Sequence, residues 1–248
     1  MNVRNSLAPA LALAALAGSV SAAPVVTNHF DADPNWDAVN NRTAPQNFGF
    51  TNSNLAGASA GEIGGFYARH PTAAFYAHNF GPGLSFNDTL FAAGNMKVIS
   101  IPDGSGMTIG WFDSATFHYS SSRNVLGLEI LDGGVYITVA DGTTPGFPNE
   151  IATGVSSTSL TNFSLAYNPN LGSFGRVTFV GNGTTVVSYD LTAAERGNGA
   201  QFNHFGTFDI TLLGQTTELY FDDLIYSIPE PSCLALLALG GVLLRWRR

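Results

Sequence analysis

The sequence predicts an all-β fold for residues 23–228, a sandwich or jelly roll. Short runs of alternating apolar and polar residues dominate this stretch, whereas helix-type periodicity is scarce. Gly, Asn, Asp and Pro separate the runs at a spacing of about ten residues, which suits a sandwich or jelly roll. The 18 Phe and 8 Tyr of the chain are enough to build its core.

Residues 23–72 differ from the rest because they are rich in Asn and Gly, and we predict one initial strand there followed by long loops. Residues 132–134 (Asp-Gly-Gly) and 181–183 (Gly-Asn-Gly) predict tight hairpins. The alternating pattern predicts ten further strands, at residues 73–80, 90–101, 107–113, 125–131, 135–139, 160–167, 176–180, 185–191, 205–213 and 217–226.

Alternation also predicts which side chains face the core. In residues 135–139 the three odd-numbered valine and isoleucine residues should point inward, and Tyr136 and Thr138 outward. The same pattern in residues 205–213 predicts that Phe208 points inward.

The N-terminal 22 residues predict a signal peptide. Arg4 supplies a short positive region, and residues 7–17 form an apolar run rich in Ala and Leu. Small residues end at Ala22, so we expect signal peptidase to cleave there and to leave Ala23 as the new N-terminus. The chain is therefore predicted to be exported.

Residues 229–248 predict a second targeting segment. Pro229, Glu230, Pro231 and Ser232 form a boundary, because proline fixes φ and lacks an N–H. The apolar run after them is about 12 residues, or about 18 Å as a helix, against a hydrocarbon core of about 30 Å. The basic end would hold the C-terminus in the cytoplasm, and it consists of Arg245, Arg247 and Arg248. Two interpretations stay open, a short membrane anchor and a processed sorting signal.

This order of Pro-Glu-Pro-Ser, apolar helix and arginine cluster resembles the PEP-CTERM sorting domain of Gram-negative bacteria, although Ile228 and Cys233 depart from its usual residues. The resemblance implies transient anchoring in the inner membrane and recognition by an exosortase, an integral membrane enzyme. It also implies delivery to the cell surface or to an exopolysaccharide matrix. It covers only the tail.

The body is similar to concanavalin A-like and laminin-G-like sandwiches of bacterial surface proteins. The residues that carry the similarity are Phe30 and Asp31 with Trp36, the segments 110–114 and 219–224, and the segment 61–66 with Arg69. The resemblance implies a jelly roll whose first and last strands are neighbours in one sheet. This fold hosts lectins, hydrolases and adhesion modules, so it does not choose a function.

Charge and composition exclude several classes of function. Of the 10 basic and 18 acidic residues in the chain, residues 23–228 hold six and seventeen, which gives this stretch a net charge of −11. Such an acidic domain does not predict nucleic-acid binding. The single Cys lies in the tail, so a disulfide or thiol site in the body is excluded.

Catalytic motifs are missing from the sequence. It has no Glu-x-Asp-x-x-Glu run for a retaining glycosidase, no Gly-x-Ser-x-Gly and no His-Glu-x-x-His. We therefore predict a non-enzymatic, carbohydrate-associated or adhesion module with a polysaccharide partner. A structural matrix protein and a divergent polysaccharide hydrolase or lyase are the alternatives.

The adjacent carboxylates Asp222 and Asp223 predict a site for a structural calcium ion, and no other cofactor is predicted from the sequence. Strand alternation places Asp223 in the apolar row of Leu219 and Phe221, where a carboxylate needs hydrogen bonds or a cation. Asp31 and Asp33, expected on the neighbouring first strand, would complete a set of oxygen ligands for Ca²⁺. The alternative is that backbone N–H groups at a bulge satisfy one Asp while water solvates the other.

Glu62 and Arg69 flank a Gly-rich stretch and predict either an ion pair that fixes a loop or part of a sugar-facing site. Exposed Trp36 and Tyr136 would stack on the apolar faces of sugar rings in such a site. These four residues are the predicted ligand-binding set.

Overall fold

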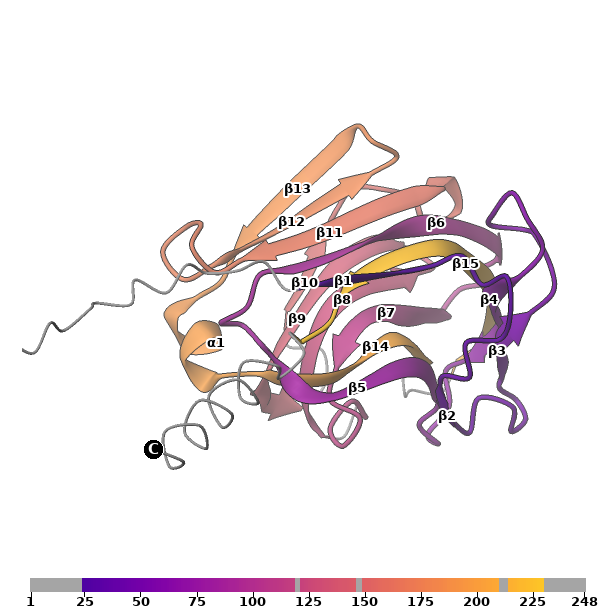
Figure 1. Cartoon of the computed structure of the whole chain (residues 1–248), viewed down its shortest axis with the longest axis horizontal. Coiled ribbons are helices and arrows are strands. Elements are labelled where there is room, and N and C mark those ends of the chain that lie inside the picture. Colours follow the sequence, from indigo (N-terminus) through magenta and orange to yellow (C-terminus); the bar gives the residue numbers. More distant parts are fainter. Residues whose placement is uncertain (1–23, 119–120, 146–148, 210–213, 230–248) are drawn as a thin grey trace, which may run out of the picture.

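The computed structural model describes residues 24–118, 121–145, 149–209 and 214–229 and consists of two stacked antiparallel sheets (Figure 1). The all-β jelly-roll prediction is confirmed. The first sheet has eight strands in the described residues, in the spatial order β13 (Thr185–Asp190), β12 (Arg176–Gly181), β11 (Asn162–Asn168), β6 (Leu90–Ser100), β15 (Thr216–Ser227), β4 (Glu62–Ala68) and β3 (Asn47–Thr51), with β1 (Val25–Asn28) also paired to β15.

The second sheet has seven strands in the same part of the chain. Their order is β10 (Asn149–Ala152), β9 (Gly134–Pro145), β8 (Ser122–Leu131), β7 (Gly106–Phe112), β14 (Gln201–Asp209), β5 (Phe75–Ser85) and β2 (Asp37–Val39). A 3-10 turn (Ser157–Ser159) and the helix α1 (Ala193–Asn198) complete the elements. We call the sheet faces that pack on each other inner and the opposite faces outer.

Each of the ten predicted ranges overlaps a strand, and the first and last strands are neighbours as predicted. Both predicted hairpins are also present, between β8 and β9 and between β12 and β13. The prediction of loops before residue 73 was wrong, because β2, β3 and β4 form there. In β4 glycine is required by close packing: a Cβ at Gly64 would come within 2.3 Å of the Leu219 carbonyl oxygen.

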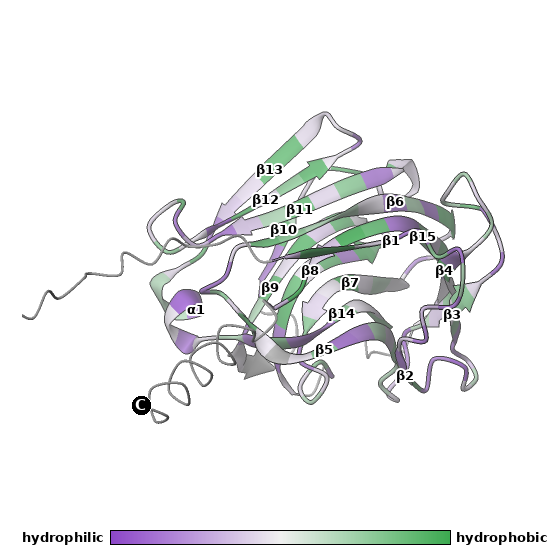
Figure 2. Cartoon of the chain, viewed as in Figure 1, coloured by the Kyte–Doolittle hydropathy of each residue, from purple (hydrophilic) through white to green (hydrophobic). Residues whose placement is uncertain are grey.

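The main core lies between the inner faces of the two sheets. Figure 2 shows hydrophobic positions alternating with more polar ones along many strands, as a half-buried strand requires. At its centre Phe205 of β14 stacks on Tyr226 of β15 with ring centroids 4.2 Å apart, and Trp111 of β7 contacts Phe205 edge-on. The Trp111 indole N–H donates to the Ser227 carbonyl, so the ring also ties the two sheets together.

A second apolar cluster covers part of the outer face of the second sheet. Phe208 belongs to this cluster, so the prediction that it points into the main core was wrong. Phe117, in the segment after β7, lies over the face and packs edge-on against Phe75. The remaining buried members are Ala77, Phe112, Val125 and Ala140. The outer face of this sheet is therefore partly covered.

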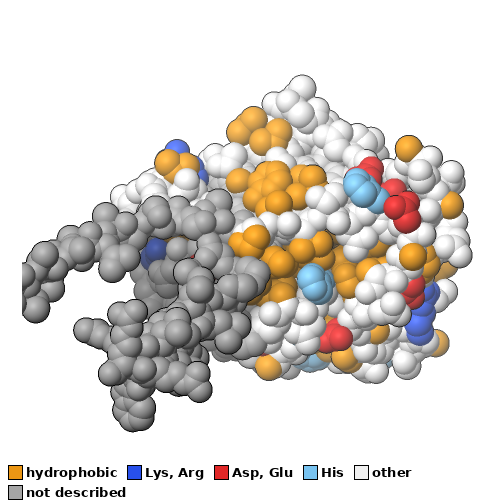
Figure 3. All heavy atoms as spheres, in the orientation of Figure 1, with side chains coloured by type: hydrophobic (Ala, Val, Ile, Leu, Met, Phe, Trp, Pro, Cys, Tyr) orange, Lys and Arg blue, Asp and Glu red, His pale blue; other side chains and the backbone are white. Residues whose placement is uncertain are grey.

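The predicted targeting segments lie almost wholly outside the described residues. This holds for the signal peptide 1–22 with Ala22 and Ala23, and for Glu230, Pro231, Ser232, Arg245, Arg247 and Arg248. Pro229 is described and lies beside β5, where a Cβ at Gly83 would come within 3.1 Å of its ring. Among the described residues, no helix has the length and apolar character needed to cross a membrane. Figure 3 shows apolar side chains gathered near the middle of one face, with charged ones towards the margins.

Candidate functional site

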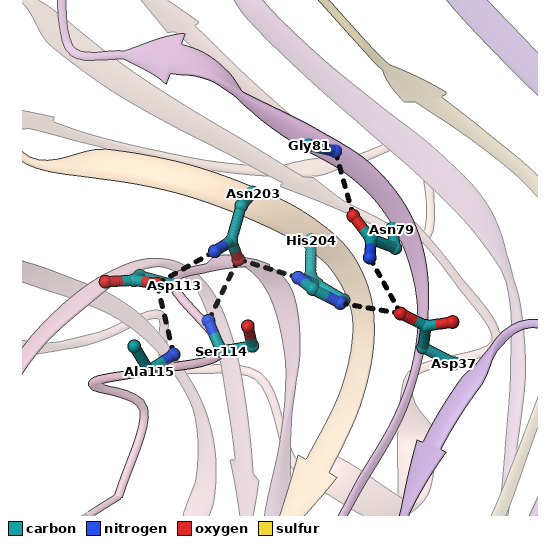
Figure 4. A network of polar contacts seen from close by, with 8 residues as sticks. All are labelled: Asp37, Asn79, Gly81, Asp113, Ser114, Ala115, Asn203 and His204. Atoms are coloured by element: carbon teal, nitrogen blue, oxygen red, sulfur yellow. Dashed lines mark hydrogen bonds and ion pairs between the residues drawn. The ribbon is translucent and has the colours of Figure 1, made fainter.

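A chain of hydrogen-bonded polar side chains crosses the outer face of the second sheet, and we call it the outer-face network. Its members come from four strands or their ends: Asp37 from β2, Asn79 from β5, Asp113 directly after β7, and Asn203 and His204 from β14 (Figure 4). Together they form one connected surface feature made from segments far apart in sequence.

Strand register brings these residues together. His204 lies opposite Asn79 on one side and Phe112 on the other, so their side chains share a face. Asp37 lies opposite Ala77, two residues before Asn79, and therefore points the same way. A bulge in β14 just before His204 places Asn203 at the rim of this face.

Asn203 is held at the centre of the network by three hydrogen bonds. Its Nδ2 donates to Asp113 Oδ1 at 2.9 Å, and its Oδ1 accepts the Ser114 N–H at 2.9 Å. These two bonds fix which way the amide points. The same Oδ1 lies 2.6 Å from His204 Nδ1, and because an amide oxygen only accepts, that ring nitrogen carries the proton.

His204 links Asn203 to the opposite end of the network. Its Nε2 lies 3.4 Å from Asp37 Oδ2, and Asn79 Nδ2 donates to the same oxygen at 2.8 Å. The ring stacks on Phe112. Burial lowers the pKa of His204, whereas Asp37 raises it. Because a carboxylate oxygen only accepts, Nε2 donates to Asp37 when the ring is doubly protonated.

The network is open to solvent at both ends. The Asp37 side chain is 52% exposed, and its Oδ1 has no partner among the described residues. Asp113 and Asn203, together with Gln201 and Phe202, line a hollow of about 190 Å³. The arrangement presents fixed carboxylate and amide groups to a ligand rich in hydroxyl groups.

A buried polar cluster lies farther along the same outer face. Arg123 Nη2 lies 3.4 Å from Glu129 Oε1, and both side chains are essentially unexposed. Burial raises the pKa of Glu129 to about 8; Arg123 opposes this shift and the nearby negative charge of Glu150 reinforces it. Thr108 and Thr138, on the flanking strands, bury hydroxyls that have no hydrogen-bond partner among the described residues.

Glu129 and Glu150 form a pair of carboxyl groups that sequence spacing did not predict. Glu150 raises the pKa of Glu129, whereas Glu129 Oε2 has no hydrogen-bond partner among the described residues. Glu129 is also fully buried, which leaves no room for a sugar between them. This geometry is not that of a glycosidase site.

The four predicted calcium ligands are not all brought together. Asp31, Asp222 and Asp223 line a hollow of about 160 Å³ with His29, whereas Asp33 accepts a hydrogen bond from a tyrosine hydroxyl elsewhere. Asp31 and Asp33 follow β1 and are not part of it. In the described part of the chain, no three or more His, Cys, Asp or Glu side chains are grouped so that they could hold a metal ion.

A β-bulge decides which of the two neighbouring aspartates is buried. Alternation predicted that Asp223 shares the apolar row of Leu219 and Phe221, but the register shifts after Asp222, and Asp223 adopts φ of 51°. Asp222 is therefore the buried residue, and its Oδ1 accepts the Asp223 N–H at 2.7 Å. The Asp223 carboxylate contacts His29 Nδ1 at 2.6 Å and accepts from Asn95.

Glu62 and Arg69 do not form the predicted ion pair, because they lie near opposite ends of β4. Glu62 is fully buried and accepts the backbone N–H groups of Leu55 and Ala56. Arg69 donates to the Gly104 carbonyl. The buried glutamate therefore fixes the loop before β4 and does not face a ligand.

Trp36 and Tyr136 are also separated. Trp36 is only 8% exposed and contacts the rings of Phe30, Tyr76 and Tyr226, so the prediction of an exposed stacking residue was wrong. Tyr136 is half-buried and lines a hollow of about 260 Å³ near the β8–β9 hairpin. The hairpin hollow is distinct from the outer-face network.

Comparisons with known proteins support the fold. No family model matches the chain, and no curated protein matches it. The endo-β-1,4-glucuronan lyase of the fungus Trichoderma reesei is similar in structure, with a TM-score of 0.54 and 10% identity over 84% of this chain and 96% of the lyase. This similarity shows a shared fold and no more.

Two further solved structures match with lower scores. One is the carbohydrate recognition domain of Emp47p, with a TM-score of 0.48 and 10% identity over 84% of this chain and 95% of that one. The other is a lectin from Bauhinia forficata in complex with GalNAc, with a TM-score of 0.45 and 14% identity over 83% and 98%.

Proposed function

We propose that this chain is an exported, non-catalytic protein that binds carbohydrate through the outer-face network. One observation carries the proposal: Asp37, Asn79, Asp113, Asn203 and His204 are held by hydrogen bonds on the outer face of the second sheet, where Asp37 and Asn79 are exposed. Groups that are held in place before binding lose little conformational entropy when a ligand arrives.

The chemistry of these groups suits sugars. Carboxylate and amide oxygens accept hydrogen bonds from hydroxyls, and amide N–H groups donate to them. Asp37 Oδ1, which has no partner in the described residues, is available for such a bond at the open end of the network.

The proposed location of the protein follows from the targeting segments predicted at residues 1–22 and 229–248. Signal peptidase would remove residues 1–22, and an exosortase-type enzyme would act at the Pro-Glu-Pro boundary after transient anchoring in the inner membrane. Residues 23–228 would then reach the cell surface or an exopolysaccharide matrix of a Gram-negative-type bacterium. This sorting role rests on the sequence resemblance.

A glycan array probed with the full chain tests the binding proposal. We expect Asp37→Ala to weaken binding at least tenfold, because it removes the exposed acceptor and the partner of His204 and Asn79. Asp190→Ala is the matched control, since Asp190 is an exposed carboxylate on the edge strand β13 of the other sheet. No binding to any glycan, or equal losses in both variants, would contradict the proposal.

A further inference from the structure

Negative charge occupies both ends of the outer-face network. Asp113 lies at the hollow beside Gln201, and Asp37 lies at the exposed end on β2. His204 lies between them with its ring only 5% exposed, so it presents little surface to a ligand. A ligand placed along the network therefore meets a carboxylate at each end.

No Lys or Arg takes part in this network within the described residues. Arg123 shares the sheet face but is 1% exposed and faces Glu129. The other basic residues of the described chain lie elsewhere: Arg42 bonds the Phe50 carbonyl, Arg69 the Gly104 carbonyl, Arg176 pairs with Asp190, Arg196 donates to Tyr167, and Lys97 belongs to β6 of the first sheet.

These charges determine the class of sugar that the site accepts. A uronic acid carries a carboxylate on every residue, and like charges brought together across an interface oppose binding. Protein sites that bind carboxylates place arginine or lysine against them. The outer-face network provides aspartate at those positions.

We propose that this site accepts neutral glycans and rejects polyuronates, an inference that rests on the proposed carbohydrate binding. The chain would thus share its fold with a glucuronan lyase while its network favours uncharged sugars. Uncharged hydroxyls accept and donate hydrogen bonds without adding charge between Asp37 and Asp113.

The test compares oligosaccharides that differ only in the carboxylate. The probes are hexasaccharides of β-1,4-glucan, β-1,4-mannan and β-1,4-galactan, each paired with the same compound oxidised at C6 to the uronic acid. The full chain is titrated with every probe by calorimetry at pH 7 and low salt. We expect at least one neutral probe to bind at least tenfold more tightly than its oxidised partner.

The variant Asp37→Asn/Asp113→Asn tests the cause. Asparagine retains the shape and the acceptor oxygen of aspartate but removes its charge. The ratio of the affinity for the neutral probe to that for its oxidised partner should therefore fall towards one. Asp190→Asn, on the other sheet, should leave the preference unchanged. Circular dichroism of both variants checks that they are folded.

The outcomes separate the two proposals. If oxidised probes bind as tightly as neutral ones, and Asp37→Ala weakens both, carbohydrate binding stands and the selectivity is wrong. An unchanged preference in the folded double variant also overturns the selectivity. If none of the probes binds and no glycan on the array binds the protein, the proposed function itself is wrong.

Discussion

Glu129 is a buried carboxyl group whose protonation should affect stability. Its pKa rises from 4.5 to about 8 through burial, so between these values the folded protein holds a proton that the unfolded chain releases. Its contribution to stability is therefore complete at low pH and is lost as the pH rises towards 8. The denaturation midpoint should fall from pH 5 to pH 9, and Glu129→Gln should flatten that dependence.

Asp209 is a second buried carboxyl group that should contribute to the same pH dependence of stability. Burial also raises its pKa to about 8, so part of the pH dependence should remain in Glu129→Gln. Asp103→Asn, a change at an exposed carboxyl group, should behave like the wild type. The same pH dependence in Glu129→Gln and in the wild type would contradict the assignment.

Calcium binding at Asp222 and Asp223 stays a prediction. Their hydrogen bonds to backbone and side-chain groups match the alternative, in which a bulge satisfies the buried carboxylate. If Ca²⁺ binds, adding it to the chelator-treated full chain should raise the melting temperature by several degrees, and Asp223→Ala should abolish the rise. A melting temperature unaffected by Ca²⁺ would show that the prediction is wrong.

At the scale of elements, three glycines form a row across the second sheet, two residues along the strands from His204 and Phe112. Gly206 of β14 lies opposite Gly110 of β7, which lies opposite Gly127 of β8. A Cβ at Gly110 would come within 2.4 Å of the Leu126 carbonyl oxygen and 2.5 Å of the Gly127 Cα. The strands can approach this closely only because the side chains are absent.

Gly110→Ala should therefore destabilise the fold by about 1–3 kcal/mol, the range expected for overpacking. Chemical denaturation measures this change. Gly197→Ala is the control, because Gly197 lies in α1 with open space around it and alanine favours helix. If Gly110→Ala lowers the free energy of unfolding no more than Gly197→Ala does, the strands tolerate a side chain at position 110.

Periodicity in the sequence predicted the described strands from residue 73 onward except β10. Strands such as β11 and β12 have one buried face and hence a clear alternation. Periodicity failed for β4, whose two adjacent glycines resemble a loop. It also missed α1, although Thr192 and Glu195 form a capping box that is visible in the sequence.

The outer-face network could not be predicted from the sequence. Its members lie as far as 167 residues apart, and their contacts depend on the order of strands and on a bulge in β14. The adjacent polar residues Asn203 and His204 within an aromatic strand were the only local signal. At Asp222 another bulge reversed the predicted faces, which no period of two can anticipate.

At the scale of the whole molecule, export and sorting give a separate prediction. In a host that exports the chain, the mature protein should begin at Ala23 and should have lost the basic C-terminal end. Intact-mass spectrometry of the surface and extracellular fractions measures both ends. A protein of residues 23–248 found only in membrane fractions would contradict processing at the Pro-Glu-Pro boundary.

The sandwich presents two outer faces, and the central claim is that the outer-face network of the second sheet binds carbohydrate. Backbone amide chemical shifts of the isotope-labelled full chain, recorded while a neutral oligosaccharide selected by the glycan array is added, test this claim most directly. We predict saturable shifts centred on Asp37, Asn79, Asn203 and His204. Shifts confined to the first sheet or to the β8–β9 hairpin, or none at all, would contradict it.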